Sequence, residues 1–221
     1  METTGIPETS KETFKYPTTY TTPLVPPVTE SENKPVLEGD TETWKAIADT
    51  YVTISTTGTK DAGTESKMLV KKDDGSKMTR NAYVKFDTTE TTLEGVSKAT
   101  LRLYCTFASS DSAVISQRDV KLYAVSGDWA ELTFDWSSQP AILTKVADVD
   151  TSGYKSNRWI EIDVTEYVRD HWGEVMNLSL RNTGEKGGNN HVRFNSRNAT
   201  SNQPMLVVEG YVATEEPVVN G

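Results

Sequence analysis

Cysteine and histidine are scarce in this chain of 221 residues. The single cysteine, Cys105, excludes a disulfide framework within the chain and a cysteine-rich zinc site. Only two histidines, His171 and His191, are present. A histidine-rich metal site and most catalytic triads therefore lack the side chains that they require.

Long apolar runs and an excess of basic charge are also missing. No apolar run approaches the ~18–20 residues that a membrane-spanning helix needs. The chain has 23 lysines and arginines against 32 aspartates and glutamates, a formal net charge of −9. Because binding of nucleic acid depends on clustered basic side chains, a nucleic-acid partner is not expected. The opening residues show no basic segment followed by an apolar one, so the sequence reads as a fragment of a longer exported chain.

Proline is concentrated near the N-terminus, and threonine crowds the same stretch. Proline fixes φ and donates no backbone hydrogen bond, so such a sequence favours extended, solvated chain. We predict a Pro/Thr-rich linker, extended or disordered, over residues 1–43. A second linker is predicted over residues 214–221.

Alternation of apolar and polar side chains dominates residues 44–213, which is typical of strands with one buried face. One run places Ala99, Leu101, Leu103, Cys105 and Phe107 on the same face. Strands do not alternate with helices, which disfavours a doubly wound parallel sheet. The pattern predicts an all-β fold, an antiparallel β-sandwich of about nine or ten strands. One short helix is expected over residues 165–172, with Thr165 as its N-cap.

Seven short segments, taken in order, give this region a recognisable pattern. They are ADTYV at 48–52, AYVKFD at 82–87, KATLRLY at 98–104, GDWAE at 127–131, WIEIDVT at 159–165, RFNSR at 193–197 and PMLVV at 204–208. In order and spacing they resemble the DNRLRE domain, also described as carbohydrate-binding module family 96. The sequence departs from the family at Asn198, where an acidic residue is common, and in the Gly/Asn-rich loop 184–190.

The resemblance implies a jelly-roll β-sandwich that is extracellular, either secreted or attached to the cell surface. It implies polysaccharide as the ligand, with acidic polymers such as alginate among the possibilities, and neighbouring domains of the same polypeptide as partners. By analogy with other jelly-roll carbohydrate modules, it also implies a structural calcium near the first strand, with Asp49 as a ligand. The alternative for this region is an arginine, Arg193 or Arg197, that ties loops together through carboxylates such as Asp49 or Asp87.

Sugar binding requires flat aromatic rings and polar side chains, and an acidic polymer adds a need for arginine and lysine. The polar faces of the predicted strands and the closing motif supply these groups as Tyr83, Lys85, Arg102, Tyr104, Lys121, Tyr123, Asn177, Arg181 and Arg193. We predict that strand pairing gathers them into one grooved sheet surface. The alternative is an ordinary solvated face with the tyrosine rings packed under loops.

A second candidate site is a set of basic and amide side chains in loops at one end of the sandwich. Its members are Lys71, Lys72, Lys77, Arg80, Asn189, Asn190, His191, Arg193 and Arg197. The alternative is a set of solubilising turns. Among the tryptophans, Trp129 and Trp159 are expected to anchor the core, and Trp44 is expected to be an exposed platform or a clasp for the linker.

Two carboxylate pairs, Asp128 with Glu131 and Glu161 with Asp163, have a spacing that glycosidase acids can take. Strand alternation produces such pairs in any sandwich, and no nucleophile motif accompanies them. We therefore predict that the chain is not an enzyme but a non-catalytic carbohydrate-binding module. The alternative is a structural or adhesive spacer without a sugar site.

Overall fold

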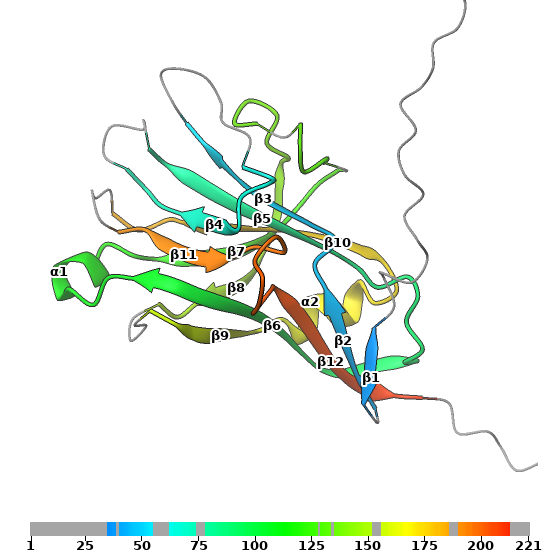
Figure 1. Ribbon diagram of the computed structural model, residues 1–221. Helices are drawn as coiled ribbons and strands as arrows, with labels where there is room; N and C mark the ends of the chain where they lie inside the picture. Colours follow the sequence, from blue (N-terminus) through cyan, green and yellow to red (C-terminus); the bar gives the residue numbers. More distant parts are fainter. Residues whose placement is uncertain are drawn as a thin grey trace, which may run out of the picture. The chain divides into compact units, whose positions relative to one another are not determined.

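The computed structural model describes residues 35–38, 40–54, 62–73, 78–127, 129–133, 135–151, 156–185 and 190–212. Within these residues the chain forms two antiparallel sheets, which confirms the predicted all-β sandwich (Figure 1). Residues 1–34 and 214–221 of the predicted linkers lie outside the described residues.

The larger sheet has seven strands in the order β1-β2-β12-β6-β11-β4, with β9 paired to β6. Their bounds are β1 Val36–Glu38, β2 Thr41–Lys45, β4 Lys67–Val70, β6 Gly95–Ala108, β9 Arg158–Asp163, β11 Val192–Asn195 and β12 Met205–Tyr211. The smaller sheet has five strands in the order β3-β5-β10-β7-β8. Their bounds are β3 Ala48–Thr53, β5 Arg80–Asp87, β7 Val120–Val125, β8 Ile142–Val149 and β10 Val175–Asn182.

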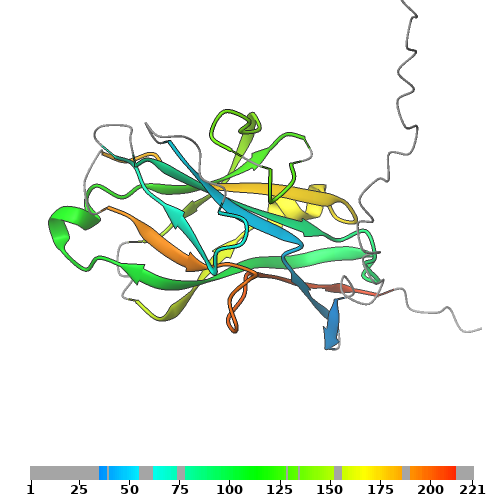
Figure 2. The ribbon, with the colours of Figure 1, turned by 45° about the horizontal axis from the view of Figure 1, so that its top comes forward.

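The long strand β6 organises the seven-stranded sheet. Arg102 pairs with Glu161 of β9 on one edge of β6 and with Met205 of β12 on the other. Further along β6, Cys105 pairs with Phe194 of β11. β12 and β11 therefore follow one another along the same edge of β6 (Figure 2). Side chains from β9, β11 and β12 thus lie beside those of one strand.

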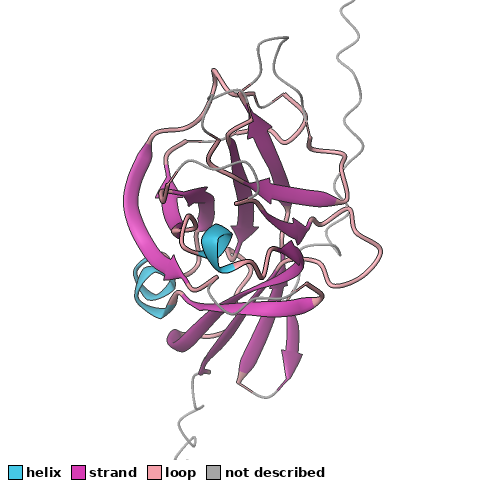
Figure 3. Cartoon of the chain, turned by 90° about the vertical axis from the view of Figure 1, so that its left-hand side faces the viewer, coloured by secondary structure: helices cyan, strands magenta, loops and turns pink. Residues whose placement is uncertain are grey.

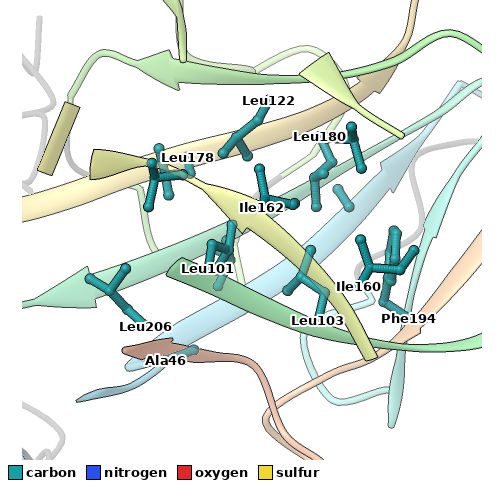
Figure 4. Close-up of a cluster of buried hydrophobic side chains, with 14 of the residues drawn as sticks. Ala46, Leu101, Leu103, Leu122, Ile160, Ile162, Leu178, Leu180, Phe194 and Leu206 are labelled. Carbon is teal, nitrogen blue, oxygen red and sulfur yellow. The ribbon is translucent and has the colours of Figure 1, made fainter. Parts of the chain in front are cut away.

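The core fills the space between the two layers of strands, which are seen from the α1 end in Figure 3. Alternate residues of each strand point inward, because successive side chains of a strand face opposite sides of the sheet. The close-up in Figure 4 shows apolar side chains of both sheets together: Leu101, Leu103, Ile160, Ile162 and Leu206 of the larger sheet, and Leu122, Leu178 and Leu180 of the smaller. Full burial of each such side chain contributes about 1.5–3 kcal/mol. Cys105 is buried among them, as predicted.

The N-terminal boundary of the sandwich lies earlier than predicted. Residues 36–38 form β1 and residues 41–43 begin β2, although both were expected in the linker. The reason lies in Trp44, which is only 2% exposed and packs edge-on against Trp172 at 6.3 Å between ring centroids. Trp44 is therefore a core residue, neither an exposed platform nor a clasp for the linker.

A buried carboxylate secures β2 to the sandwich. Glu42 is fully buried, and its carboxylate accepts hydrogen bonds from Trp44 Nε1, from the Thr91 hydroxyl, and from the amide and hydroxyl of Thr92. A buried charge is tolerated when hydrogen bonds replace its water. These bonds join β2 to the loop that precedes β6.

A β-bulge reverses the predicted orientation of Phe107. The register between β6 and β11 shifts between Arg193, which faces Phe107, and Phe194, which faces Cys105. An extra residue in one strand inverts the alternation beyond it. Thr106 and Phe107 are therefore both half-buried on the outer side, and Phe107 does not share the core face of Cys105.

Two short helices accompany the described strands. α2, Thr165–Asp170, is the predicted helix, but the Thr165 side chain does not cap it. Asp163 instead accepts hydrogen bonds from the amide and hydroxyl of Thr165. The second helix, α1, Ser112–Ile115, was not predicted and is capped by Asp111. None of the described helices has the length and apolar character that a membrane span requires.

Candidate functional site

The predicted surface residues do not form one groove, because they lie on two opposite faces. Strands β5, β7 and β10 of the five-stranded sheet carry Tyr83, Lys85, Lys121, Tyr123, Asn177 and Arg181. Strands β6 and β11 of the seven-stranded sheet carry Arg102, Tyr104 and Arg193. Alternation shows that a side chain points away from the core, but it does not show which sheet the strand joins.

The loop between β7 and β8, described at residues 126–127, 129–133 and 135–141, covers β5 on the outer face of the five-stranded sheet. Tyr83 is 0% exposed and lies edge-on to Trp129, with 6.0 Å between their ring centroids. Lys85 is 7% exposed, its Nζ donates to the backbone oxygen of Trp129 at 2.8 Å and lies 4.8 Å from the centroid of that ring. Tyr83 and Lys85 are therefore structural, as the alternative prediction of tyrosines under loops described.

Arg181 and Lys121 of this face also bond to other side chains of the protein. Arg181 Nη2 donates to the Tyr83 hydroxyl at 2.9 Å, and that hydroxyl donates to Gln139 Oε1 at 2.8 Å. Burial raises the pKa of Tyr83 above its ordinary value. Lys121 pairs with Asp119 at 3.1 Å and with Asp148 at 3.5 Å. Arg181 and Lys121, which were predicted to bind a ligand on this face, are therefore bound to other side chains of the protein.

The outer face of the seven-stranded sheet carries a different arrangement. Tyr104 of β6 faces Trp159 of β9, and their rings meet edge-on at 5.4 Å between centroids. The Arg102 guanidinium lies 4.8 Å from the centroid of the Trp159 ring, and its Nε donates to Glu161 Oε1 at 3.0 Å. Tyr104 and Trp159 are each only half-buried. Two rings and a guanidinium are thus combined on an open sheet surface.

A second ring cluster follows on the same face where β6 ends and β11 begins. The rings of Phe107 and His191 stack with centroids 4.6 Å apart and planes at 13°. The Arg193 guanidinium lies 5.7 Å from the centroid of Phe107. We call the set Arg102, Tyr104, Phe107, Trp159 and Arg193 the aromatic face. Because a strand rises ~3.3 Å per residue, it follows β6 for roughly 17 Å.

A shallow depression of about 200 Å³ extends the aromatic face at the Arg102 end. It lies between β6, β9 and β12 and is lined by Lys98, Thr100, Arg102, Glu161, Val207 and Glu209. Lys98 and Glu209, both in its lining, pair at 3.3 Å. Hydroxyl, carboxylate and cationic groups there complement the polar edges of a sugar ring.

Trp159 was predicted to anchor the core, so it was not identified from the sequence as a residue of the candidate site. Trp159 lies on the outer side of β9, at the same parity as Glu161, and Ile160 and Ile162 point inward. The alternation of residues 159–163 carried this signal, but the weight given to a large ring as a core anchor outweighed it. Trp129 is buried, but as a member of the covering loop, packed on the outer face of the five-stranded sheet rather than between the sheets.

The region of Asp49 forms a tie between three segments. Asp49 is 1% exposed, and its Oδ2 accepts a hydrogen bond from the Arg197 amide at 2.5 Å. The Asp49 amide donates to Glu131 Oε1 at 3.1 Å, and the Arg197 guanidinium binds both oxygens of Glu131. The predicted arginine tie is thus present, with Glu131 as the carboxylate that the guanidinium binds. It connects β3, the covering loop and the turn after β11.

Burial raises the pKa of Asp49 from 3.8 to about 7. The hydrogen bond from the Arg197 amide opposes this shift, the Glu131 charge adds to it, and the Arg197 charge opposes it. The Asp49 Oδ1 atom is buried and has no partner among the described residues. An uncompensated buried carboxylate oxygen favours the protonated acid.

The residues around Asp49 do not fit a calcium ion. Calcium takes about 6–8 oxygen ligands, and ionised carboxylates are its preferred donors. Both oxygens of Glu131 are bound by Arg197, whose guanidinium would repel a cation. The described part of the chain contains no group of three or more His, Cys, Asp or Glu side chains placed to hold a metal. The geometry favours the arginine tie over the metal.

The carboxylate pair on β9 is likewise engaged. Glu161 pairs with Arg102, and Asp163 bonds Thr165. Asp128 of the other pair lies outside the described residues, and Glu131 binds Arg197. His171 lies against the Tyr167 carbonyl at 2.9 Å. The described carboxylates Glu131, Glu161 and Asp163 are thus each bound to another side chain of the protein.

The sequence of the sandwich is similar to that of a known protein family. A family model described as carbohydrate-binding module family 96 matches residues 40–210. The match begins just before β2 and ends within β12, so it spans nearly the whole described sandwich. No curated protein matches the chain.

Proposed function

Because the chain belongs to carbohydrate-binding module family 96, we propose that it binds polysaccharide on the aromatic face of the seven-stranded sheet. The family consists of non-catalytic binding modules, and we propose no reaction for this chain. Binding would place sugar rings on Tyr104, Trp159 and Phe107, with Arg102 and Arg193 beside them.

The contact between Arg102, Tyr104 and Trp159 is the observation that carries this proposal. Sugars present apolar C–H faces that pack on aromatic rings, and hydroxyls at their edges that bond polar side chains. Trp159 is held in place by Tyr104 on one side and by Arg102 on the other. A ring that is fixed before binding loses little conformational entropy when the ligand arrives.

An acidic polysaccharide fits the charge of this face better than a neutral one. The outward positions of the seven-stranded sheet carry the cations Lys45, Lys67, Lys98, Arg102 and Arg193, and the carboxylates Glu161, Asp163 and Glu209. Among the described side chains of this face, cations outnumber carboxylates by five to three, although the chain as a whole carries a net charge of −9. A local positive potential of this kind attracts anionic polymers and weakens as salt is added. Uronic-acid polymers are therefore the first ligands to test.

The biological role that we propose is that of a tether. An extracellular module, secreted or attached to the cell surface, would hold neighbouring domains of its polypeptide at a polysaccharide. Binding would raise the effective concentration of an attached activity at that polymer. A weak single site suffices when several modules act together.

Affinity electrophoresis tests the proposal with a pair of tryptophan variants. Trp159 and Trp136 are both half-buried, but Trp136 lies in the loop over the five-stranded sheet. We expect Trp159→Ala to abolish retardation by a gel that contains alginate, and Trp136→Ala to keep it. Loss of one stacking ring lowers affinity by about tenfold or more, since it removes ~1–3 kcal/mol.

The outcomes separate the proposal from its alternative. Equal retardation of the wild type and Trp159→Ala would contradict binding at the aromatic face. No retardation by any polymer in a panel of acidic and neutral polysaccharides would favour the spacer function. Release of soluble sugar from any polymer by the purified chain would show an enzyme instead.

A further inference from the structure

Cationic side chains converge at the end of the sandwich where β6 ends, β11 begins and α1 lies (Figure 1). Lys71 and Arg80 face each other through two backbone hydrogen bonds, of 3.0 and 2.9 Å. Lys71 follows β4, which pairs with β11, so it lies beside His191. We call Arg80, Arg118 and Arg193 the arginine cluster.

His191 reports how closely these groups approach one another. The pKa of His191 is lowered from 6.5 to about 4, mainly by burial and in addition by the charges of Arg193, Lys71, Arg80 and Arg118. Its ring is therefore neutral at neutral pH and stacks on Phe107. The charges of four cations from four different segments thus act on one imidazole.

The arginine cluster is not neutralised within the protein. Arg118 is 8% exposed, and its Nη2 donates to the Ser109 oxygen at 2.6 Å. Its Nε and Nη1 atoms are buried without a partner among the described residues, as is Nε of Arg80. Arg193 lies on Phe107, and none of the three arginines forms an ion pair with a described residue. Only Lys71 has a carboxylate, that of Asp73 at 2.6 Å.

Such an arrangement is unfavourable unless an anion is bound. Buried N–H donors without acceptors destabilise a fold by about 1–3 kcal/mol each, and more when they carry charge. Like charges in a partly buried site repel one another strongly, because water screens them less there. A bound anion would relieve the repulsion and accept the free N–H groups at once.

We propose that the arginine cluster and His191 form a binding site for a tetrahedral oxyanion, and specifically for the sulfate ester of a polysaccharide. The donors come from β5, from the segment before β7 and from β11, so they approach from several directions. A tetrahedral oxyanion offers oxygens in several directions, whereas a planar carboxylate is best matched by one arginine fork. A fully ionised sulfate ester also keeps its charge at low pH.

The proposed oxyanion site adjoins the aromatic face. Arg193 belongs to both, and Phe107 of the aromatic face stacks on His191 and lies under the Arg193 guanidinium. The identity of the polymer rests on the proposed function, but the binding of inorganic sulfate does not. A separate depression of about 250 Å³ also touches Arg118 and is lined by Asp119, Asp148 and Asp150. Those carboxylates would repel an anion, so the proposed site lies on the side of His191.

The structure brings together part of the second set of loop residues that the sequence predicted. Lys71, Arg80, His191 and Arg193 meet at this end. Asn190 supports the loops, since its Nδ2 donates to the oxygens of Lys72 and Glu185. Lys77 and Asn189 lie outside the described residues. Arg197 belongs to the tie at Asp49 instead, and Arg118 was missed.

The two histidines of the chain allow a direct test by NMR. His191 lies in the proposed site, whereas His171 stacks on Tyr167 beside α2 and serves as an internal control. We expect sodium sulfate, but not sodium chloride at equal ionic strength, to shift the His191 ring signals saturably. The pKa of His191 should rise by about 1–3 units in sulfate, since an adjacent anion favours the charged ring. His171 should not respond.

Variants identify the site and separate it from the aromatic face. Arg80→Gln, at a half-buried position, should weaken sulfate binding about tenfold, since a charge-assisted hydrogen bond contributes ~1.5–3 kcal/mol. Lys145→Gln on β8 removes the same charge elsewhere and should bind sulfate as the wild type does. Equal responses of His191 to sulfate and chloride, or an unchanged affinity in Arg80→Gln, would overturn the proposal.

Polymers complete the test. A sulfated polysaccharide should retard the wild type more than its desulfated form, and Arg80→Gln should remove that difference. Trp159→Ala should lose retardation by both polymers yet still bind inorganic sulfate. If Trp159→Ala binds polymers normally while Arg80→Gln loses sulfate, the proposed function fails and the oxyanion site stands.

Discussion

The two outer faces of the sandwich come from the same kind of strand but differ in what covers them. On the five-stranded sheet, Tyr83 lies beneath Trp129 and is fully buried. On the seven-stranded sheet, Tyr104 lies beside Trp159 and both rings remain half-exposed. The outward tyrosine is structural on one face and available on the other. The connections between strands therefore decide which face can bind a ligand.

The cover over the five-stranded sheet has identifiable anchors. Within the covering loop, Asp135 accepts hydrogen bonds from the amides of Ser137 and Ser138, which fixes a local turn. At the edge of the loop, Glu131 approaches Gly63 so closely that a Cβ at position 63 would collide with its backbone oxygen. Glycine is required at such a close approach. The described part of the seven-stranded sheet has no comparable loop across Trp159 and Tyr104.

The largest expected effect comes from removing the Trp129 ring, which lies in the covering loop. Trp129→Ala deletes a ring that packs on Tyr83 and Lys85, so it should lower the free energy of unfolding by about 3–5 kcal/mol. Trp159→Ala, on the open face, should lower it by only about 1 kcal/mol because its ring is half-exposed. Urea unfolding of both variants measures the contrast. Similar losses in the two would show that the faces do not differ in this way.

A rise in pH should reduce the stability that Asp49 contributes at the edge of the covering loop. Asp49 has a pKa of about 7 in the folded state, compared with its ordinary value of 3.8, so the folded state holds this proton more tightly. Stability from this group is therefore present below about pH 4 and is lost as the pH rises to about 7. The loss corresponds to as much as ~4 kcal/mol.

The isosteric variant isolates this effect. Asp49→Asn keeps an oxygen for the Arg197 amide but carries no charge, so it should gain stability relative to the wild type as the pH rises from about 4 to about 8. Unfolding in urea across that range measures the gain. A constant difference between the two proteins over the whole range would contradict the raised pKa.

Strand faces were largely predictable from the sequence, but their partners were not. The inward positions of β6 from Ala99 to Cys105 follow from alternation alone, and all of them are buried. The bulge opposite Arg193 could not be predicted, because it depends on how β11 meets β6. Alternation beyond that point therefore assigned Phe107 to the wrong face.

The candidate site was predictable only in part, for the same reason. Arg102 and Tyr104 were identified from the polar side of one strand, and the structure leaves them on an open face. Lys85 has an equally polar position, yet it is buried because residues 126–141 fold over it. Arg118 gave no periodic signal, since it lies between α1 and β7 and its importance arises from three-dimensional neighbours.

The open face should tolerate loss of its ion pair. Arg102 and Glu161 are 31% and 60% exposed in their side chains, and such pairs contribute about 0–1 kcal/mol. Arg102→Gln and Glu161→Gln should each change the free energy of unfolding by less than ~1 kcal/mol. The coupling energy between the two positions, obtained from the double variant, should also be less than ~1 kcal/mol. Thermal unfolding at low and high salt measures both. A coupling of several kcal/mol would mean that this pair is structural and that the face is not free for a ligand.

The smallest effect is expected from calcium, at the anchored edge of the covered face. Asp49 offers one unpartnered oxygen, but Arg197 occupies both oxygens of Glu131 and supplies the positive charge that a cation would otherwise provide. We expect calcium and a chelator to give the same midpoint of thermal unfolding, within error. Glu131→Gln provides the matched control, because it weakens the arginine tie while keeping the shape of the side chain. A calcium-dependent rise in the midpoint that Asp49→Asn abolishes would show that a metal, rather than the arginine, holds the three segments together. In that case the cover of the five-stranded sheet would depend on calcium, and the contrast between the two faces could be changed by removing the metal.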